Sequence, residues 1–72
     1  MDTEIHLLDV VALTKDLPGH GLSRGQVGTV VEELAPHVLE VEFCDDAGRT
    51  YAIAPVAADH LLVLRYETAE TA

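Results

Sequence analysis

Apolar segments recur about every ten residues along the chain, separated by clusters of glycine, proline and aspartate, a spacing typical of short strands in a sandwich or barrel. The clearest strand is expected over 38–44. There Leu39, Val41 and Phe43 point to one face, because the side chains of a strand alternate between its two faces. Glu40 and Glu42 point to the other face. This segment therefore predicts a strand with one apolar and one acidic side.

Four further strands are expected, over 7–14, 26–34, 51–54 and 61–66. The first is apolar on both faces, which indicates burial on both sides. Residues 15–28 contain four glycines and one proline, so a long loop without regular structure is expected to follow it. Pro55 is expected to end the fourth strand, because proline cannot donate a hydrogen bond to a ladder.

Tight turns are expected to connect the later strands. Pro36 and His37 turn the chain between the second strand and the third. The hairpin 45–48 follows the third strand, and in it Gly48 supplies the positive φ that closes such turns. Residues 57–60 are expected to form a single 3₁₀ turn before the last strand.

The expected order is a strand, a long loop, a three-strand meander, a 3₁₀ turn and a last strand, which is the order of a small Src-homology-3-like barrel. The predicted fold class is therefore all-β, with about five antiparallel strands. The domain is expected to span 1–66, with 67–72 as a disordered acidic tail. The alternative is an open antiparallel sheet that completes itself by dimerising. The apolar positions predict a core of Val11, Leu13, Val30, Leu39, Val41, Phe43, Ile53 and Leu62.

Acidic residues dominate the charge of the chain. Thirteen aspartates and glutamates against four lysines and arginines give a net charge of -9. Nucleic-acid binding depends on neutralising phosphates with lysine and arginine, so such binding is not expected. The acidity has two interpretations, namely a solvated coat that keeps a small protein soluble, or complementarity to a basic protein partner.

No targeting or membrane segment is expected. Residues 1–5 are acidic where a secretory signal would be basic, and the apolar runs are far shorter than the ~20 residues that span a bilayer. The single cysteine, Cys44, excludes an intramolecular disulfide and suits a reducing compartment. We therefore expect a soluble, cytoplasmic protein in which Cys44 is a small apolar filler on or near a strand.

The residues that could carry chemistry are scattered. The four histidines are separated by 14, 17 and 23 positions, whereas zinc sites usually include a closely spaced pair of ligands, so neither a metal nor another cofactor is expected. Ser23 and Cys44 are the chief candidate nucleophiles, but nothing beside them resembles a strained nucleophile turn. The glycine-rich loop also lacks the pattern of a phosphate-binding loop. The chain is therefore not expected to be an enzyme.

Two segments are candidates for binding a partner. The loop 15–26 corresponds to one wall of the ligand groove in barrels of this kind, and loops on rigid scaffolds concentrate binding residues. Alternatively, Leu17 and Leu22 plug one end of the barrel. The second segment is the acidic one around the third strand, where Glu32 and Glu33 of the neighbouring strand add further charge. The candidate partner-binding residues are Lys15, Leu17, His20, Leu22, Arg24, Glu40, Glu42, Asp45, Asp46 and Tyr51.

Several stretches share their order and spacing with a known family, namely 8–13, 24–32, 39–43, 45–46 with 48–51, and 59–62. They resemble the bacterial family catalogued as domain of unknown function 4926. The resemblance implies a small β-barrel found in bacteria and cyanobacteria, with no established activity. The stretch 25–31 is also similar to the glycine-valine core of KOW modules, in which one glycine permits a tight turn and the other lets a neighbouring strand approach closely.

The favoured hypothesis is a non-enzymatic protein–protein interaction module with a basic protein as its partner, such as an antitoxin, an immunity-type inhibitor or an accessory subunit. The alternative, a KOW-like nucleic-acid-associated module, is disfavoured by the scarcity of basic residues. A third hypothesis, a metal- or ligand-binding accessory domain of an enzyme, is disfavoured by the histidine spacing. Because so small a chain has a thin core, a homodimer is also expected, with 61–66 as the pairing edge.

Overall fold

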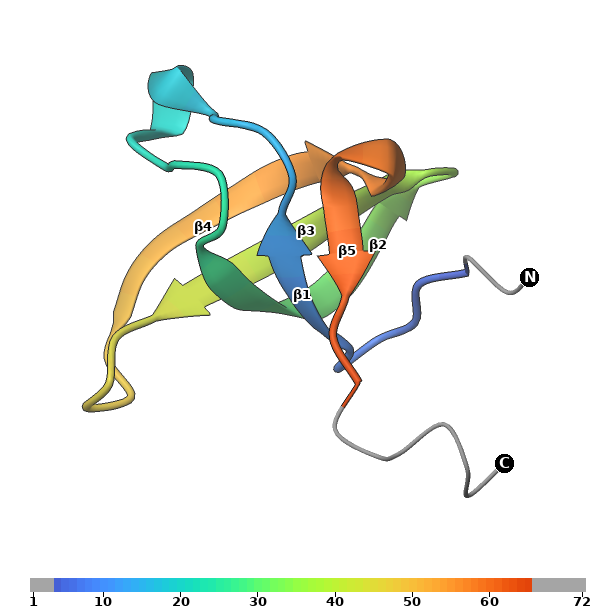
Figure 1. The fold of residues 1–72 in the computed structure, drawn as a ribbon. Helices are drawn as coiled ribbons and strands as arrows, with labels where there is room; N and C mark the ends of the chain where they lie inside the picture. Colours follow the sequence, from blue (N-terminus) through green and yellow to red (C-terminus); the bar gives the residue numbers. More distant parts are fainter. Residues whose placement is uncertain (1–3, 66–72) are drawn as a thin grey trace.

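One strongly curved antiparallel sheet is the main structural element of residues 4–65, the part of the chain that the computed structural model describes (Figure 1). Its strands are β1 (Val10–Leu13), β2 (Val27–Ala35), β3 (Val38–Cys44), β4 (Thr50–Ala57) and β5 (Leu61–Val63). Two 3₁₀ turns, η1 (Pro18–His20) and η2 (Ala58–His60), precede β2 and β5. The expected all-β class, the five antiparallel strands and the 3₁₀ turn before the last strand are confirmed.

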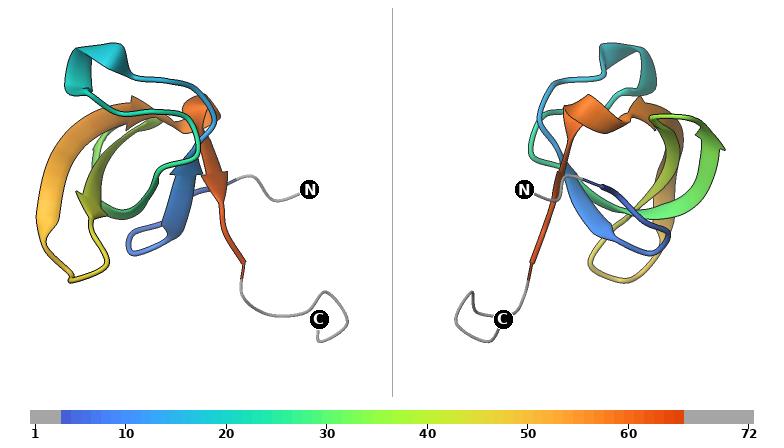
Figure 2. Two further views of the ribbon diagram at one scale, coloured as in Figure 1. Left: turned by 60° about the vertical axis from the view of Figure 1, so that its left-hand side comes forward. Right: turned by 90° about the vertical axis from the view of Figure 1, so that its right-hand side faces the viewer.

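The strands lie in the order β4-β3-β2-β1-β5, and the sheet curls into a barrel that stays open between β4 and β5 (Figure 2). Within residues 4–65 these two strands do not pair with each other, so each leaves one edge free. β5 ends at Val63, so the prediction that the last strand continues through 64–65 is wrong. Tyr66 and the expected tail 67–72 lie outside the described residues. Within the described part of the chain, no helix has the length and apolar character needed to cross a membrane.

The chain before β1 turns where a strand was expected. β1 begins at Val10, because Leu7 and Leu8 form a tight turn instead. Asp9 closes this turn by accepting a hydrogen bond at Oδ2 from the backbone N–H of His6 (2.8 Å) and by donating its own backbone N–H to the His6 carbonyl (3.1 Å). Leu8 takes a φ of +70°, which is uncommon for a residue other than glycine. The prediction of a strand from residue 7 is therefore wrong.

Pro55 lies inside β4, and the prediction that it ends the strand is wrong. It is opposite Glu40 in the ladder of β3 and β4. The backbone N–H of Ala58 donates to the His37 carbonyl (2.8 Å), and this bond sets the alternation of bonded and non-bonded pairs along the ladder. By that alternation Pro55 falls in a non-bonded pair, with its nitrogen directed away from β3. The ladder loses no hydrogen bond, and proline is tolerated on this edge strand.

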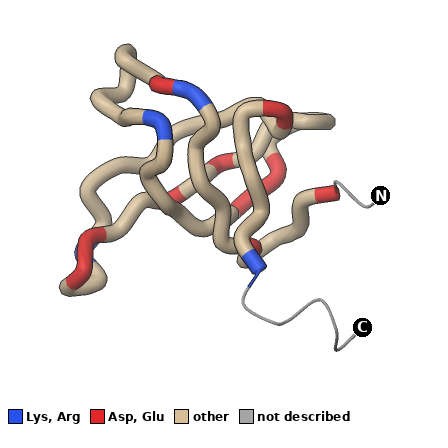
Figure 3. Tube along the Cα trace, in the orientation of Figure 1, with Lys and Arg blue, Asp and Glu red and all other residues tan. Residues whose placement is uncertain are grey.

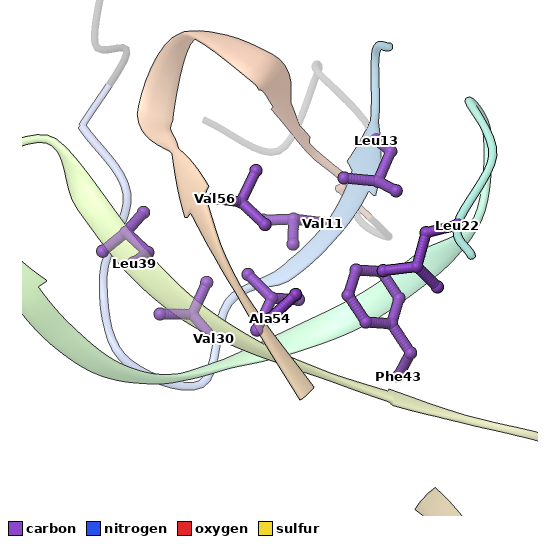
Figure 4. Packing of buried hydrophobic residues seen from close by; sticks show 9 residues of the cluster. Val11, Leu13, Leu22, Val30, Leu39, Phe43, Ala54 and Val56 are labelled. Carbon is purple, nitrogen blue, oxygen red and sulfur yellow. The ribbon is translucent and has the colours of Figure 1, made fainter. Parts of the chain in front are cut away.

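The core fills the inside of the curved sheet (Figure 4). The buried side chains are Val11, Leu13, Leu22, Val30, Leu39, Val41, Phe43, Ala54 and Val56. Six of the eight expected core residues are among them. The other two predictions are wrong, because Ile53 is 53% exposed and Leu62 is 57% exposed. Ile53 is opposite the outward-facing Glu42, so the register of β4 directs Ala54 and Val56 inward in its place.

The turns between the later strands have the expected chemistry. Gly48 takes a φ of +83°, as predicted, and His37 takes a φ of +66° in the turn between β2 and β3. In the hairpin between β3 and β4, Oδ1 of Asp45 accepts hydrogen bonds from the backbone N–H groups of Ala47 (2.9 Å) and Arg49 (3.0 Å). This short polar side chain therefore mimics backbone and holds the hairpin closed.

Candidate functional site

Three glutamates lie on the outer face of the sheet where β2 and β3 pair. Glu32 is directly opposite Glu40, and Glu42 lies two residues further along β3, so the three side chains share one face. The hydroxyl of Thr50 on β4 donates a hydrogen bond to Oε2 of Glu42 (2.6 Å). Glu32, Glu40 and Glu42 are called the acidic face below.

A bulge in β2 decides which of its two glutamates joins the acidic face. The register between β2 and β3 shifts immediately before Glu32, which leaves Val31 without an opposite residue. Without this shift Glu32 would be opposite the buried Leu39. With the shift, Glu32 is opposite Glu40, whereas Glu33 is opposite Leu39 and lies on the other face of the sheet.

The two strands that carry the acidic face, β2 and β3, contain no lysine or arginine. Figure 3 shows lysine and arginine at the loop between β1 and β2, and acidic residues along β2, β3 and the β3–β4 hairpin. Arg49 pairs with Asp45 in that hairpin (Nε to Oδ2, 3.3 Å), and both side chains are exposed to water. Among residues 4–65, no lysine or arginine forms an ion pair with a glutamate of the acidic face.

The loop 15–26 is an ordered excursion rather than the unstructured segment expected. Leu17 and Leu22 form an isolated bridge, with backbone hydrogen bonds in both directions (2.8 and 3.1 Å), and η1 lies between them. At its base, Oδ1 of Asp16 accepts a hydrogen bond from the backbone N–H of Arg24 (2.8 Å). The Leu17–Leu22 bridge and the bond between Asp16 and Arg24 thus hold the two ends of the loop together.

The two leucines of this loop differ from its polar residues in their surroundings. Leu22 is only 3% exposed and belongs to the core, and the half-buried Leu17 packs against that core. Leu22 therefore has almost no exposed surface with which to contact a partner. Its position agrees with the alternative in which these leucines plug one end of the barrel. Lys15, His20 and Arg24 are exposed.

Tyr51 connects β4 to the loop 15–26. Its hydroxyl accepts a hydrogen bond from Nε2 of Gln26 (3.2 Å), and its ring lies 6.4 Å from the ring of Phe43 at an angle of 42°. A register shift between β3 and β4 falls beside Tyr51, between the partners of Phe43 and Cys44. Tyr51 is nevertheless half exposed, so one side of its ring remains open to a partner.

The candidate residues therefore separate into two groups. Glu40 and Glu42 lie on the acidic face. Lys15, His20, Arg24 and Tyr51 lie on or beside the loop 15–26. Asp45 and the exposed Asp46 lie in the β3–β4 hairpin, where Asp45 has a structural role in closing the turn.

Cysteine and histidine do not gather into a site. Cys44 is exposed at the end of β3, with Sγ 3.6 Å from Oγ1 of Thr50, so the prediction of a small apolar filler is wrong. The alternation of β3 explains this, because Phe43 takes the inward position beside it. Within residues 4–65, no three His, Cys, Asp or Glu side chains are grouped so that they could hold a metal ion.

Sequence reasoning missed the residues that support these surfaces. Thr50 bonds to Glu42, Gln26 bonds to Tyr51, and Arg49 pairs with Asp45. Only the pair of Arg49 and Asp45 could have been predicted from the sequence, because these residues are four positions apart in a predicted hairpin. The other two contacts join residues that are 8 and 25 positions apart, and they depend on how the strands pair.

The strand order, the long loop after β1 and the 3₁₀ turn before β5 define a small all-β domain with the element order of a Src-homology-3-like barrel. The family model described as Domain of unknown function (DUF4926) matches residues 7–63, and the chain belongs to this family. Neither the curated proteins nor the solved structures contain a match to the chain. The family description leaves the function open.

Proposed function

We propose that this protein is a non-enzymatic interaction module whose acidic face binds a basic surface on another protein. The observation that carries the proposal is the direct cross-strand pair of Glu32 and Glu40, which has no lysine or arginine ion-paired to it within residues 4–65. Like charges directly opposite each other destabilise a sheet. A cationic group on a partner would neutralise this pair and remove the repulsion between the two carboxylates.

Physical chemistry favours a protein with clustered lysine or arginine as the partner. Glu32, Glu40 and Glu42 add their fields on one face, and the whole chain carries a net charge of -9. Such a field speeds the association of an oppositely charged protein and makes the association rate depend steeply on salt. An antitoxin, an immunity-type inhibitor or an accessory subunit would use a surface of this kind.

The loop 15–26 provides a second contact region in this proposal. Lys15, His20 and Arg24 are exposed on it, and Tyr51 lies beside its base. An amphipathic ring such as that of Tyr51 is a frequent anchor in protein interfaces. In this proposal, these residues determine the specificity for one basic partner, whereas the acidic face determines the association rate.

Charge reversal on the acidic face is expected to slow association with the partner. The test compares the double variant Glu40→Lys/Glu42→Lys with the control Glu33→Lys/Asp59→Lys. The control changes the net charge equally, but it acts at exposed positions outside the acidic face. Wild-type protein and both variants are immobilised, and basic proteins are captured from an extract of the native host.

One basic protein is expected to bind both the wild type and the control. Its binding is expected to be lost with Glu40→Lys/Glu42→Lys. Its association rate, measured by surface plasmon resonance, should fall at least tenfold with that double variant, because steering can raise on-rates by about 10–10³-fold. The rate should also fall steeply as salt is added. An association rate that is indifferent to salt and equal for both double variants would mean that the acidity only keeps the protein soluble.

Nucleic acid is not expected to bind. Phosphate binding gains from counterion release, which needs clustered cations, and the acidic face would repel phosphate. The measurement is fluorescence anisotropy with labelled single- and double-stranded RNA and DNA at low salt, where nonspecific electrostatic binding is strongest. Sub-micromolar binding under these conditions would overturn the proposal and favour the KOW-like alternative.

A further inference from the structure

The outer face of β5, β1 and the start of β2 is apolar and free of charge. Leu62 is opposite Ala12, and Ala12 is opposite Val27, so these three side chains form a row across the three strands. Leu62 is 57% exposed and Val27 is 43% exposed. Val10 lies beside Leu64, whose backbone N–H donates to the Val10 carbonyl (2.9 Å). This set, Val10, Ala12, Val27, Leu62 and Leu64, is called the apolar face.

The two free edges of the sheet differ in what they offer another strand. On the β4 edge, the nitrogen of Pro55 points outward, so this position of the edge has no donor, although the N–H of Ile53 also points outward. Proline on an exposed edge is a common protection against strand addition. The described part of the β5 edge, residues 61–65, contains no proline, and β5 lies at the margin of the sheet beside β1 alone (Figure 2).

The hydrogen bonds of β5 show which of its backbone groups are available. The bonds from Leu64 N–H to the Val10 carbonyl and from Thr14 N–H to the His60 carbonyl (both 2.9 Å) place Leu62 in a bonded pair with Ala12. Val63 therefore falls in a non-bonded pair, with its N–H and carbonyl directed away from β1. Leu61 also falls in a non-bonded pair, but its N–H donates to the Ala58 carbonyl. Within β5, Val63 is therefore the residue that offers both a donor and an acceptor to another strand, which is the arrangement that a two-fold axis requires.

We propose that a second copy of this chain pairs with β5 across a two-fold axis at Val63, antiparallel and edge to edge. Val63 of each copy then exchanges two hydrogen bonds with Val63 of the other. The register places Leu62 opposite Leu64 of the second copy, so the two apolar faces become continuous. An isologous contact of this kind closes after two copies and leaves no further free β5 edge.

Charge favours a second copy over a basic partner at this edge. None of the five residues of the apolar face is charged, whereas the acidic face lies on β2 and β3. A basic protein is therefore attracted elsewhere on the molecule. Two copies of net charge -9 repel each other, and they approach with least repulsion where neither presents a carboxylate. This inference is independent of the proposed function, which rests on the acidic face.

Two edge-strand variants test the proposal by sedimentation velocity from low to high micromolar concentration. The wild type should reach about twice the 7.8 kDa mass of one chain. Leu62→Lys should weaken the dimer about tenfold or more, a change of 1.4 kcal/mol, because it places two cations across the axis. Ile53→Lys is the matched control, since Ile53 is similarly exposed on the other edge strand, and it should leave the dimer intact.

Hydrogen exchange on the wild type provides an independent measurement. The amide of Val63 should exchange more slowly at high than at low protein concentration. The amide of Ile53, which the ladder also directs outward but on the β4 edge, should exchange equally fast at both. Added salt should strengthen the dimer by screening repulsion, whereas it weakens binding at the acidic face.

Three results would overturn the proposal. They are a monomer at high micromolar concentration in high salt, a dimer that Leu62→Lys weakens no more than Ile53→Lys does, and a Val63 amide whose exchange ignores protein concentration. A salt-strengthened dimer with no basic partner would support this inference and contradict the proposed function. Salt-sensitive binding of a basic partner to a monomer would support the proposed function and contradict this inference.

Discussion

Replacing Phe43 with alanine is expected to lower the free energy of unfolding by about 3–5 kcal/mol. Phe43 is fully buried, is the largest side chain of the core, and also supports the ring of Tyr51. Its removal loses the transfer free energy of an aromatic ring and leaves a cavity that the surrounding strands can fill only in part. Because native proteins have a total stability of only about 5–15 kcal/mol, this loss is a large share of the stability of so small a domain.

Urea unfolding followed by circular dichroism measures this loss. The matched control is Ile53→Ala on β4, which removes an apolar side chain that is already about half in water. Its cost is expected to be at most about 1 kcal/mol, since a buried methylene contributes about 0.8 kcal/mol. Equal losses for the two variants would contradict the assignment of Phe43 to the inside and Ile53 to the outside of the sheet.

Replacing Gly28 with alanine is expected to be the second most damaging small change, at about 1–3 kcal/mol. An added Cβ would lie 2.6 Å from Cγ1 of Val41 and 2.8 Å from the backbone carbonyl oxygen of Glu42. The second contact is with backbone, which cannot move without disturbing the pairing of β2 and β3. The usual gain from replacing glycine within a strand, about 0.5–1 kcal/mol, is smaller than this overpacking cost.

The control for Gly28→Ala is Gly19→Ala in η1. A Cβ at Gly19 would meet nothing within 4 Å, so this variant is expected to be neutral or to stabilise the protein by up to about 1 kcal/mol through the unfolded chain. Thermal unfolding of both variants separates the two effects. If Gly28→Ala were as stable as Gly19→Ala, the close approach of β2 to β3 would not be a constraint on the fold.

Local sequence patterns were sufficient for the elements whose signals are short range. The alternation of β3 over Val38–Cys44 agrees with the expected strand at both ends, and it directs Leu39, Val41 and Phe43 inward. The positive φ of Gly48 follows from turn chemistry, which involves neighbouring residues only. The glycine-valine stretch likewise indicated a close strand approach, and Gly28 makes it.

The sequence was a poorer guide where the direction of a side chain depends on pairing with a strand far away in the sequence. Ile53 and Leu62 have apolar side chains suited to a core, yet the pairing of their strands directs both outward. The sequence left Leu22 open between partner binding and plugging one end of the barrel, and its burial in the core supports the second. Pro55 was expected to stop β4, because a sequence does not show which way a proline nitrogen will point within a ladder.

Composition and a two-residue period are enough to show that this chain is a small, acidic, all-β protein with few basic residues and one acidic side on β3. Which carboxylates lie together depends instead on how the strands pair. A single bulge at Val31 brings Glu32 opposite Glu40 and turns Glu33 to the other face. Only the structure likewise decided that Pro55 protects one free edge while Val63 leaves the other open. Strand register is set by contacts between residues far apart in the chain, and a shift of one residue exchanges the two faces of a strand.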